Sequence, residues 1–158
     1  MRKLLTSSLL LAGLLLGNTS RAQTWASPVN LTAPYDVQTF ETCALPYEPL
    51  SIEYGAFYFY APVAVYRVST RAIGRPPALH PWALTLQPYG WDASLWVCRL
   101  HQANTLTDCE DASDNWGINA TEFATVPGTS GTRYIVVAGN VDNNGQLCGG
   151  FTLTAQRY

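Results

Sequence analysis

The stretch that decides the fold reads Gly90-Trp91-Asp92-Ala93-Ser94-Leu95-Trp96-Val97-Cys98. Its second half opens a predicted hairpin, with a β-strand over 95–100, a turn over 102–104 and a returning strand over 105–109. On both sides of this hairpin the chain continues as short β-prone runs separated by Pro, Gly and Asn. The stretch therefore predicts an antiparallel β domain.

Short β-prone runs occupy most of the chain after residue 50, and turn-forming residues separate them. We expect strands at residues 51–60, 63–70, 82–86, 95–100, 105–109, 121–126, 133–139 and 150–156. Residues 71–81 contain three prolines and are expected to form a loop, and Asn144-Gly145 predicts a hairpin turn. No segment after residue 22 has helical periodicity over three turns. About eight such strands predict an all-β, antiparallel, jelly-roll-like β-sandwich.

The N-terminus has the form of a secretory signal peptide. Arg2 and Lys3 precede an apolar run over residues 4–16, and Ser20-Arg21-Ala22 places small residues where a signal peptidase acts. The apolar run is shorter than the roughly 20 residues that span a bilayer. We therefore expect cleavage after about Ala22, a secreted or periplasmic location and no membrane span.

The remainder of the chain is expected to have two parts. Residues 23–50 begin with a stretch rich in Pro, Thr, Ser and Asn, which predicts an extended N-terminal segment. Residues 51–158 contain the predicted strands and are long enough to bury a core as one β-sandwich domain.

Removal of residues 1–22 makes the chain acidic. Six arginines then stand against eleven acidic residues, a net charge of −5, and no lysine remains. Nucleic acids and anionic lipids bind clustered cations. The charge therefore argues against nucleic acid and membrane surfaces as partners.

The four cysteines are Cys43, Cys98, Cys109 and Cys148. An even number in an exported chain predicts two disulfides, with three possible pairings. The predicted hairpin brings Cys98 close to Cys109 and favours that pair. Cys43 and Cys148 would then close a long loop, which stabilises a fold by about 3–5 kcal/mol in the chain-entropy model. A metal site is the alternative, but the chain contains no CxxC spacing.

Several blocks of the chain carry a family resemblance by their order and spacing. They are Val65-Tyr66-Arg67-Val68, Asp92 to Val97, Cys98 with Cys109-Glu110-Asp111, Tyr134 to Val137, and Gly150 to Leu153. In this order they resemble the bacterial pre-peptidase C-terminal domains. The resemblance implies a secreted accessory β-sandwich. Members are usually appended to hydrolases and lost on maturation, a role that does not carry over because this chain has no protease domain. The N-terminal segment and the loop over 71–81 do not match the family.

Catalytic motifs are scarce in this sequence. Gly128-Thr129-Ser130-Gly131 does not have the Gly-x-Ser-x-Gly spacing of a nucleophile elbow. The residues that a hydrolase would use are His80, His101, and the carboxylate pairs Asp92–Asp114 and Glu110–Asp111. Their separations, which decide such a role, do not follow from sequence. We expect a non-catalytic protein, with a secreted hydrolase acting through a carboxylate or His site as the alternative.

Hard oxygen donors gather in one segment after the predicted hairpin. Calcium takes six to eight such ligands. The candidate calcium ligands are Asp108, Glu110, Asp111, Asp114 and Asn119, with Asn115 beside them. Their spacing does not follow the EF-hand pattern, although some members of the resembled family, the collagen-binding domains among them, depend on calcium. The alternative is a polar surface loop whose side chains cap turns.

Tryptophans are the candidates for surface recognition. Trp82 and Trp96 fall in predicted strands and are expected in the core. Trp91 and Trp116 lie beside glycines in predicted loops, so they are the candidate binding residues, with a lid over the core as the other role. The sequence thus predicts a binding or accessory module that contacts an extracellular polymer or protein. A structural subunit of an extracellular assembly is a further alternative.

Overall fold

The computed structural model describes residues 24, 26–32, 34–52, 57–69, 80–102, 105–129, 131–139 and 146–158. The expected signal peptide, the loop over 71–79 and the Asn-Gly turn lie outside these residues. Within the described part of the chain, eleven strands form two sheets.

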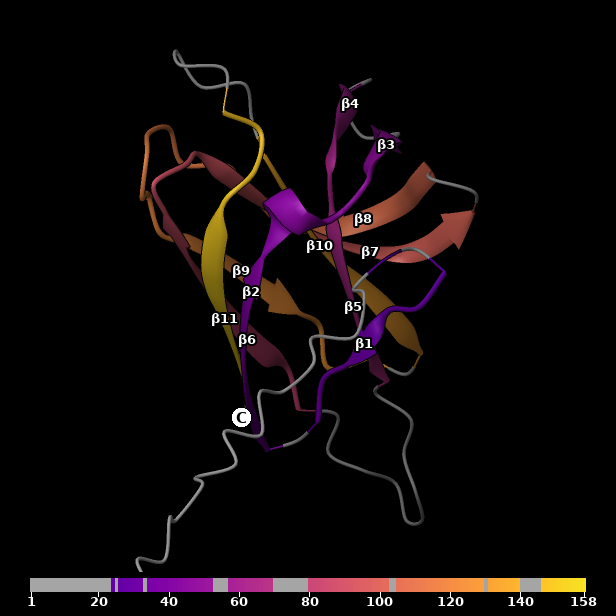
Figure 1. The fold of residues 1–158 in the computed structure, drawn as a ribbon. Helices are drawn as coiled ribbons and strands as arrows, with labels where there is room; N and C mark the ends of the chain where they lie inside the picture. The colour runs from indigo at the N-terminus through magenta and orange to yellow at the C-terminus, as the bar shows by residue number, and fades with distance from the viewer. Residues whose placement is uncertain are drawn as a thin grey trace, which may run out of the picture.

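Each sheet combines strands that are distant in sequence. The four-stranded sheet contains, in order, β2 (Tyr35–Glu41), β11 (Gly150–Arg157), β6 (Trp82–Tyr89) and β9 (Glu122–Val126). The seven-stranded sheet contains β1 (Val29–Asn30), β5 (Ala64–Ser69), β10 (Thr132–Gly139), β7 (Ala93–Gln102), β8 (Thr105–Ser113), β3 (Tyr47–Ile52) and β4 (Phe57–Pro62). A 3-10 turn, Thr42–Ala44, joins β2 to β3. Figure 1 shows the four-stranded sheet on the left and the seven-stranded sheet on the right, which confirms the predicted β-sandwich.

Eight of the strands are paired as a jelly roll. β7 pairs with β8, β6 with β9, β5 with β10, and β2 with β11, and every one of these pairs is antiparallel. Successive pairs alternate between the two sheets, as when one long hairpin is wrapped round a sandwich. The remaining strands are additions, since β1 extends the sheet beside β5 and β3 joins it beside β8, both in parallel. The predicted jelly-roll form is therefore confirmed.

The N-terminal segment belongs to both sheets. β2 is the first strand of the jelly roll, while β1 and most of β3 also fall before residue 51. The division that we expected at residue 50 therefore does not coincide with a structural boundary. The strand expected over 51–60 is divided between β3 and β4. β6 runs through Pro88 to Tyr89, because Pro88 lies beyond the last residue that β9 pairs with, where a strand tolerates a missing N–H.

The main core lies between the two sheets and is centred on Phe151. The ring of Phe151 packs edge-on against Tyr66 and Phe40, with centroids 6.3 Å away in each case, and Trp91 lies 6.5 Å away. These rings come from both sheets and from the segment before β7. Alternation along the strands explains the core, because every second residue of β6, β9 and β11 is buried.

A second apolar cluster lies on the other face of the seven-stranded sheet. Its buried members are Ile52, Val63, Val65, Trp96, Cys98, Leu106, Val136 and Ala138. β4 contacts β10 although four places separate them in the sheet, so the sheet curls around this cluster. Trp82 belongs to the main core and Trp96 to this second cluster, so the prediction that both are buried is confirmed.

The two disulfides have the favoured pairing. Cys98–Cys109 joins partners on β7 and β8, and Cys43–Cys148 joins the 3-10 turn to the residues before β11. Beside the second bridge, the buried Thr42 bonds Gly149 three times, through its N–H and twice through its hydroxyl. A Cβ on Gly149 would lie 2.4 Å from the Trp91 ring, so this close approach requires glycine.

The outer edge of β9 is covered by side chains from β8. The N–H of Thr125 donates to Asp111 Oδ2 at 2.6 Å, and the N–H of Phe123 donates to Ser113 Oγ at 3.2 Å. These two β8 side chains therefore take the place of a further strand at this edge.

The two disulfides should contribute unequally to stability. Cys43 and Cys148 are 105 residues apart, against 11 for Cys98 and Cys109. Replacing the first pair by alanines should lower the free energy of unfolding by about 4–5 kcal/mol, and replacing the second by about 3 kcal/mol, because the longer loop restricts the unfolded chain more. Urea unfolding of the two double variants measures the difference. A larger loss for the Cys98–Cys109 pair would contradict this order.

Candidate functional site

Two of the predicted calcium ligands form ion pairs with arginines. A β-bulge between Val97 and Cys98 leaves Glu110 without a partner on β7, and a bulge of this kind redirects a side chain. Glu110 accepts two bonds from Arg133, from Nε at 2.7 Å and from Nη2 at 3.0 Å. Arg99 Nε lies 3.2 Å from Glu110 Oε1, and Arg99 Nη1 lies 3.4 Å from Asp108 Oδ2.

This ion network is buried at one end and open to solvent at the other. The side chain of Arg133 is 1 % exposed and that of Glu110 is 19 % exposed, whereas the side chain of Asp108 is 53 % exposed. Arg133 also donates to Thr129 Oγ1. Two acids and two arginines thus balance each other in charge, and Glu110 serves mainly to neutralise a buried cation.

The other three predicted ligands lie elsewhere. Asp111 accepts the N–H of Thr125 at the β9 edge, as described above. Asp114 and Asn119 lie in the loop between β8 and β9. Asn119 adopts a left-handed conformation, with φ 66°, and its side-chain oxygen accepts the N–H of Gly90. Its own N–H donates to the carbonyl oxygen of Trp91 at 3.1 Å, which fastens the loop to the segment before β7.

Two buried carboxylates that we did not assign to the metal site lie beside this loop. Glu122 is wholly buried at the start of β9, and Asp92, just before β7, is 8 % exposed. Glu122 Oε2 accepts the hydroxyl of Ser113 and the N–H of Asn115, the latter at 2.9 Å. Glu122 Oε1 and Asp92 Oδ1 are buried without a hydrogen-bond partner. Burial of such oxygens destabilises the fold, because they lose their hydrogen bonds to water and form none with the protein.

The surroundings raise the pKa of Glu122 above that of an ordinary glutamate. Burial is the largest cause, and the negative charges of Asp114 and Asp92 act in the same direction. The hydrogen bonds from Ser113 and Asn115 oppose the rise, because they stabilise the carboxylate. Glu122 therefore holds a proton more tightly in the folded protein than in the unfolded chain.

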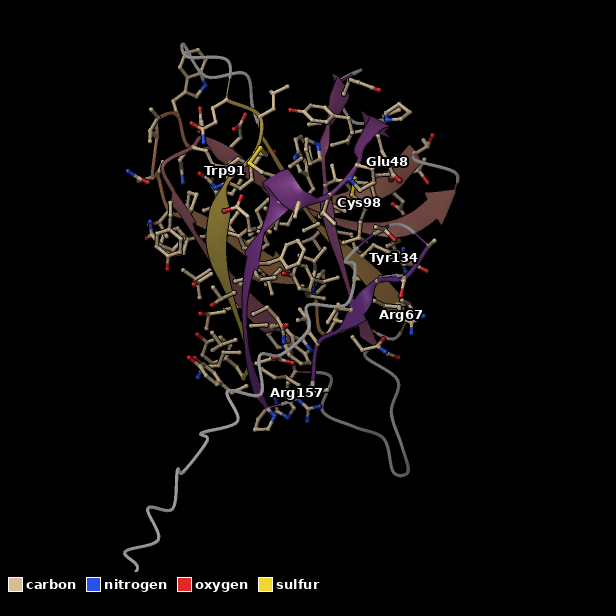
Figure 2. All side chains as sticks on the ribbon, viewed as in Figure 1. Glu48, Arg67, Trp91, Cys98, Tyr134 and Arg157 are labelled. Carbon is tan, nitrogen blue, oxygen red and sulfur yellow. A yellow bond between two sulfur atoms is a disulfide. The ribbon has the colours of Figure 1, made fainter. Side chains whose placement is uncertain are left out.

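The two candidate tryptophans differ completely in exposure. Trp91 is fully buried, and its indole N–H donates to the carbonyl oxygen of Gly150 at 2.8 Å. Figure 2 places it at the end of the molecule opposite Arg157. It packs in the core and presents no surface, whereas Trp116 is 92 % exposed in the loop between β8 and β9.

The outer face of the four-stranded sheet is a regular surface built by the strands themselves. We define it by the residues of β2, β11, β6 and β9 that alternate away from the core. The register aligns them in rows, of which one reads Val37, Thr154, Thr85 and Phe123, and the next Thr39, Thr152 and Gln87. A further row reads Glu41, Gly150 and Tyr89. The last contains Tyr35, Gln156, Ala83 and Thr125.

This outer face is polar but almost uncharged. Glu41 is the one charged residue among these positions of the four described strands. Tyr35, Tyr89 and Phe123 are 58 %, 53 % and 62 % exposed. The hydroxyl of Tyr89 donates to Thr152 Oγ1 at 2.9 Å, so the tyrosine is held over the sheet. Most of the other outer positions are threonine or glutamine, whose side chains carry hydroxyl and amide groups.

Alternation along the strands is the sequence signal that identifies Glu122 and the outer face. In β9, Glu122 shares its face with the buried Ala124 and Val126, while Phe123 faces outward. His80 is exposed ahead of β6, and the side chain of His101 lies outside the described residues.

Glu110 and Asp108 should respond differently to neutralisation. Glu110→Gln leaves the buried Arg133 without its counter-charge and should lower the free energy of unfolding by about 3 kcal/mol or more. Asp108→Asn removes an exposed partner of Arg99 and should cost about 1 kcal/mol or less, with its left-handed backbone tolerated by asparagine. Urea unfolding of both variants tests the contrast, and equal losses would contradict a buried role for Glu110.

Stability should fall as the pH rises through the titration of Glu122. Because the pKa of Glu122 is raised in the folded protein, binding of this proton increases the free energy of unfolding at acid pH. That contribution is lost as the pH rises from the ordinary glutamate pKa, about 4.3, through the higher pKa of the folded protein. Glu122→Gln should remove this loss and flatten the profile. Urea unfolding at several pH values, in buffer containing a chelator, compares the variant with the parent. Parallel profiles would contradict the assignment.

Comparison with known proteins finds no match among protein-family models, curated proteins or solved structures. No helix in the described part of the chain is long and apolar enough to cross a membrane. The two disulfides fit a protein that folds outside the reducing cytoplasm. The resemblance to pre-peptidase C-terminal domains therefore remains a prediction based on the sequence blocks.

Proposed function

We propose that this protein is an exported, non-catalytic binding module that holds an uncharged extracellular polysaccharide on the outer face. One observation carries the proposal: the outer face combines exposed aromatic rings with hydroxyl and amide groups and has a single charge. Sugar rings offer apolar faces that stack on aromatic side chains and hydroxyls that exchange hydrogen bonds with polar ones.

The low charge of the outer face favours a neutral polysaccharide over a charged partner. The chain without residues 1–22 has a net charge of −5, yet the outer positions of the four strands contain only Glu41. A charged partner would be matched by opposite charges across an interface. A neutral polymer needs none, and it avoids the cost of removing water from ionised groups.

Loop residues continue the exposed aromatic surface at one end. Gln87 donates to the carbonyl oxygen of Asn119 at 3.1 Å and accepts from Thr121 at 2.7 Å, so the loop between β8 and β9 is fastened beside Tyr89. The same loop carries Trp116 and Ile118, of which Ile118 is 45 % exposed. We place Trp116 at the end of the binding surface.

Export completes the proposal. The N-terminal sequence has the form of a signal peptide, and two disulfides require an oxidising compartment to form. A secreted or periplasmic accessory role is also what the family resemblance implies.

Retention on insoluble neutral polysaccharides tests this function. Cellulose, chitin and xylan are mixed with the protein, and the bound fraction is measured as the polymer is increased. At least one of them should retain the protein without being degraded. Tyr89→Ala and Phe123→Ala should each weaken that binding about tenfold, because a buried aromatic contact contributes more than 1 kcal/mol to an interface.

Tyr60→Ala is the matched control. Tyr60 is 59 % exposed on β4, in the other sheet, and packs against Tyr47 with ring centroids 5.9 Å apart. Its removal should leave retention unchanged. Equal losses in all three variants would contradict the outer face as the site. Retention on collagen alone would contradict a polysaccharide ligand. Release of soluble sugar would contradict a non-catalytic role and indicate a hydrolase.

A further inference from the structure

The four-stranded sheet ends at β9 on one side and at β2 on the other, where β2 lies beside β11 (Figure 1). The edge of β9 is covered by Asp111 and Ser113. β2 pairs with β11 over seven consecutive residues without a bulge, and it contains no lysine or proline. Bulges, lysines and prolines are common devices that keep an edge strand from pairing with another chain. β2 therefore lacks this protection.

The pairing with β11 decides which backbone groups of β2 point outward. The N–H of Arg157 donates to the carbonyl oxygen of Pro34 at 2.9 Å, and the N–H of Thr42 donates to that of Gly149 at 3.0 Å. These two pairs continue the register of β2 and β11, one at each end. Bonded and non-bonded pairs alternate along an antiparallel ladder, so the even-numbered residues of β2 bond β11. The backbone groups that point away from β11 therefore belong to Tyr35, Val37, Thr39 and Glu41.

In the described part of the chain, these outward N–H groups make no hydrogen bond. The two acidic side chains of β2 are occupied elsewhere. Asp36 accepts the N–H of Thr32 at 2.8 Å and the side-chain amide of Gln38 at 2.6 Å. Glu41 accepts the N–H of Cys43 at 3.2 Å. The edge thus offers a row of unpaired donors and acceptors to a further strand.

We propose that the edge of β2 binds the same edge of a second copy of this chain, antiparallel and across a two-fold axis. A two-fold axis pairs one surface with itself. The axis that uses every outward residue passes at Gln38, because Tyr35 then pairs with Glu41 of the second copy and Val37 pairs with Thr39. Each such pair exchanges two backbone hydrogen bonds, so the four-stranded sheets of the two copies join into one.

The sequence of β2 is complementary to itself in this register. The opposite positions are Val37 and Thr39, Tyr35 and Glu41, Asp36 and Phe40, and Gln38 with itself. Each acid is therefore opposite an aromatic residue, and the β-branched residues are opposite each other. Like charges directly opposite destabilise strand pairing, and this register has none. An unrelated strand would gain the backbone bonds without this match, so the residues favour a second copy.

The joined sheet places the outer faces of both copies on the same side, because residues directly opposite in a strand pair share a face. A polymer that spans both faces is then bound twice, which raises the overall affinity without a new contact. This consequence rests on the proposed function. The strand pairing does not, and it is measured without any polysaccharide.

Sedimentation of the purified protein over a concentration series tests the pairing. The parent should show a reversible equilibrium between monomer and dimer. Val37→Pro removes one outward N–H from each copy and no bond to β11, and an edge strand tolerates proline at such a position. It should raise the Kd of the dimer about tenfold or more, because two hydrogen bonds are lost. Val37→Thr keeps the N–H and the β-branched shape, so it is the matched control and should leave the Kd within about twofold.

Disulfide cross-linking tests the register and does not depend on the proline variant. Gln38→Cys places two cysteines opposite each other in a pair without backbone hydrogen bonds, where the Cα atoms are about 4.5 Å apart and a disulfide can form. Mild oxidation should yield a covalent dimer on a non-reducing gel. Tyr35→Cys is the control. Its two copies lie about 20 Å apart in this register, although Tyr35 is 58 % exposed and Gln38 is partly buried.

Three results would overturn the proposal. The first is a parent protein that stays monomeric at every concentration. The second is a folded Val37→Pro variant that dimerises as tightly as the parent, with folding checked by urea unfolding. The third is a Tyr35→Cys variant that cross-links as fast as Gln38→Cys, which indicates random collision. A monomeric protein that is still retained on polysaccharide would leave the proposed function standing.

Discussion

The pairing of β2 with β11 holds the jelly roll closed, and every other pair of the jelly roll is nested inside it. The two strands begin more than a hundred residues apart in sequence, so their pairing costs the most chain entropy of any in the fold. Three features meet at one end of that pair: the Cys43–Cys148 bridge, the bonds between Thr42 and Gly149, and the Trp91 ring against Gly149. A disulfide and a close-packed ring thus stabilise the strand pairing that has the largest loop-closure entropy cost.

The same end of the sandwich collects the polar groups that the core cannot hold. The indole N–H of Trp91 donates to the carbonyl oxygen of Gly150, and Glu122 accepts hydrogen bonds from Ser113 and Asn115. Asn119 joins the loop to the segment before β7 by hydrogen bonds to Gly90 and Trp91. Among the described residues, Asp92 Oδ1 and Glu122 Oε1 contrast with these groups, because both oxygens are buried without a hydrogen-bond partner. At the ion network, by contrast, Arg133 and Glu110 neutralise each other. The two acidic regions therefore differ, because Glu110 is paired with arginines whereas Asp92 and Glu122 each keep one buried oxygen without a hydrogen-bond partner.

Strands and one disulfide could be predicted because they depend on neighbours in sequence. β-Prone runs between turn-forming residues predicted β9, β10 and β11, and the predicted hairpin brought Cys98 close to Cys109. The contacts of the predicted calcium ligands were harder to predict, because they depend on residues that are distant in sequence. Arg133 is 23 positions from Glu110, and a β-bulge leaves Glu110 unpaired on β7 and free to bond Arg133. Of the two roles expected for Trp91, the structure shows a position in the core and not the exposed one. A glycine beside it indicated a loop, and the loop proved to run inward over Phe151.

The edge of β9 has a consequence for how the protein behaves among its own copies. An open strand edge presents free N–H groups that recruit a strand from another chain, which is the usual first step of aggregation. Here Asp111 and Ser113 already accept the N–H groups of Thr125 and Phe123, and one of those acceptors is a carboxylate. An incoming strand would have to displace both and confront a negative charge. Phe123 is therefore exposed at this edge while the N–H groups beside it are already bonded, so this edge resists pairing with a strand from another copy.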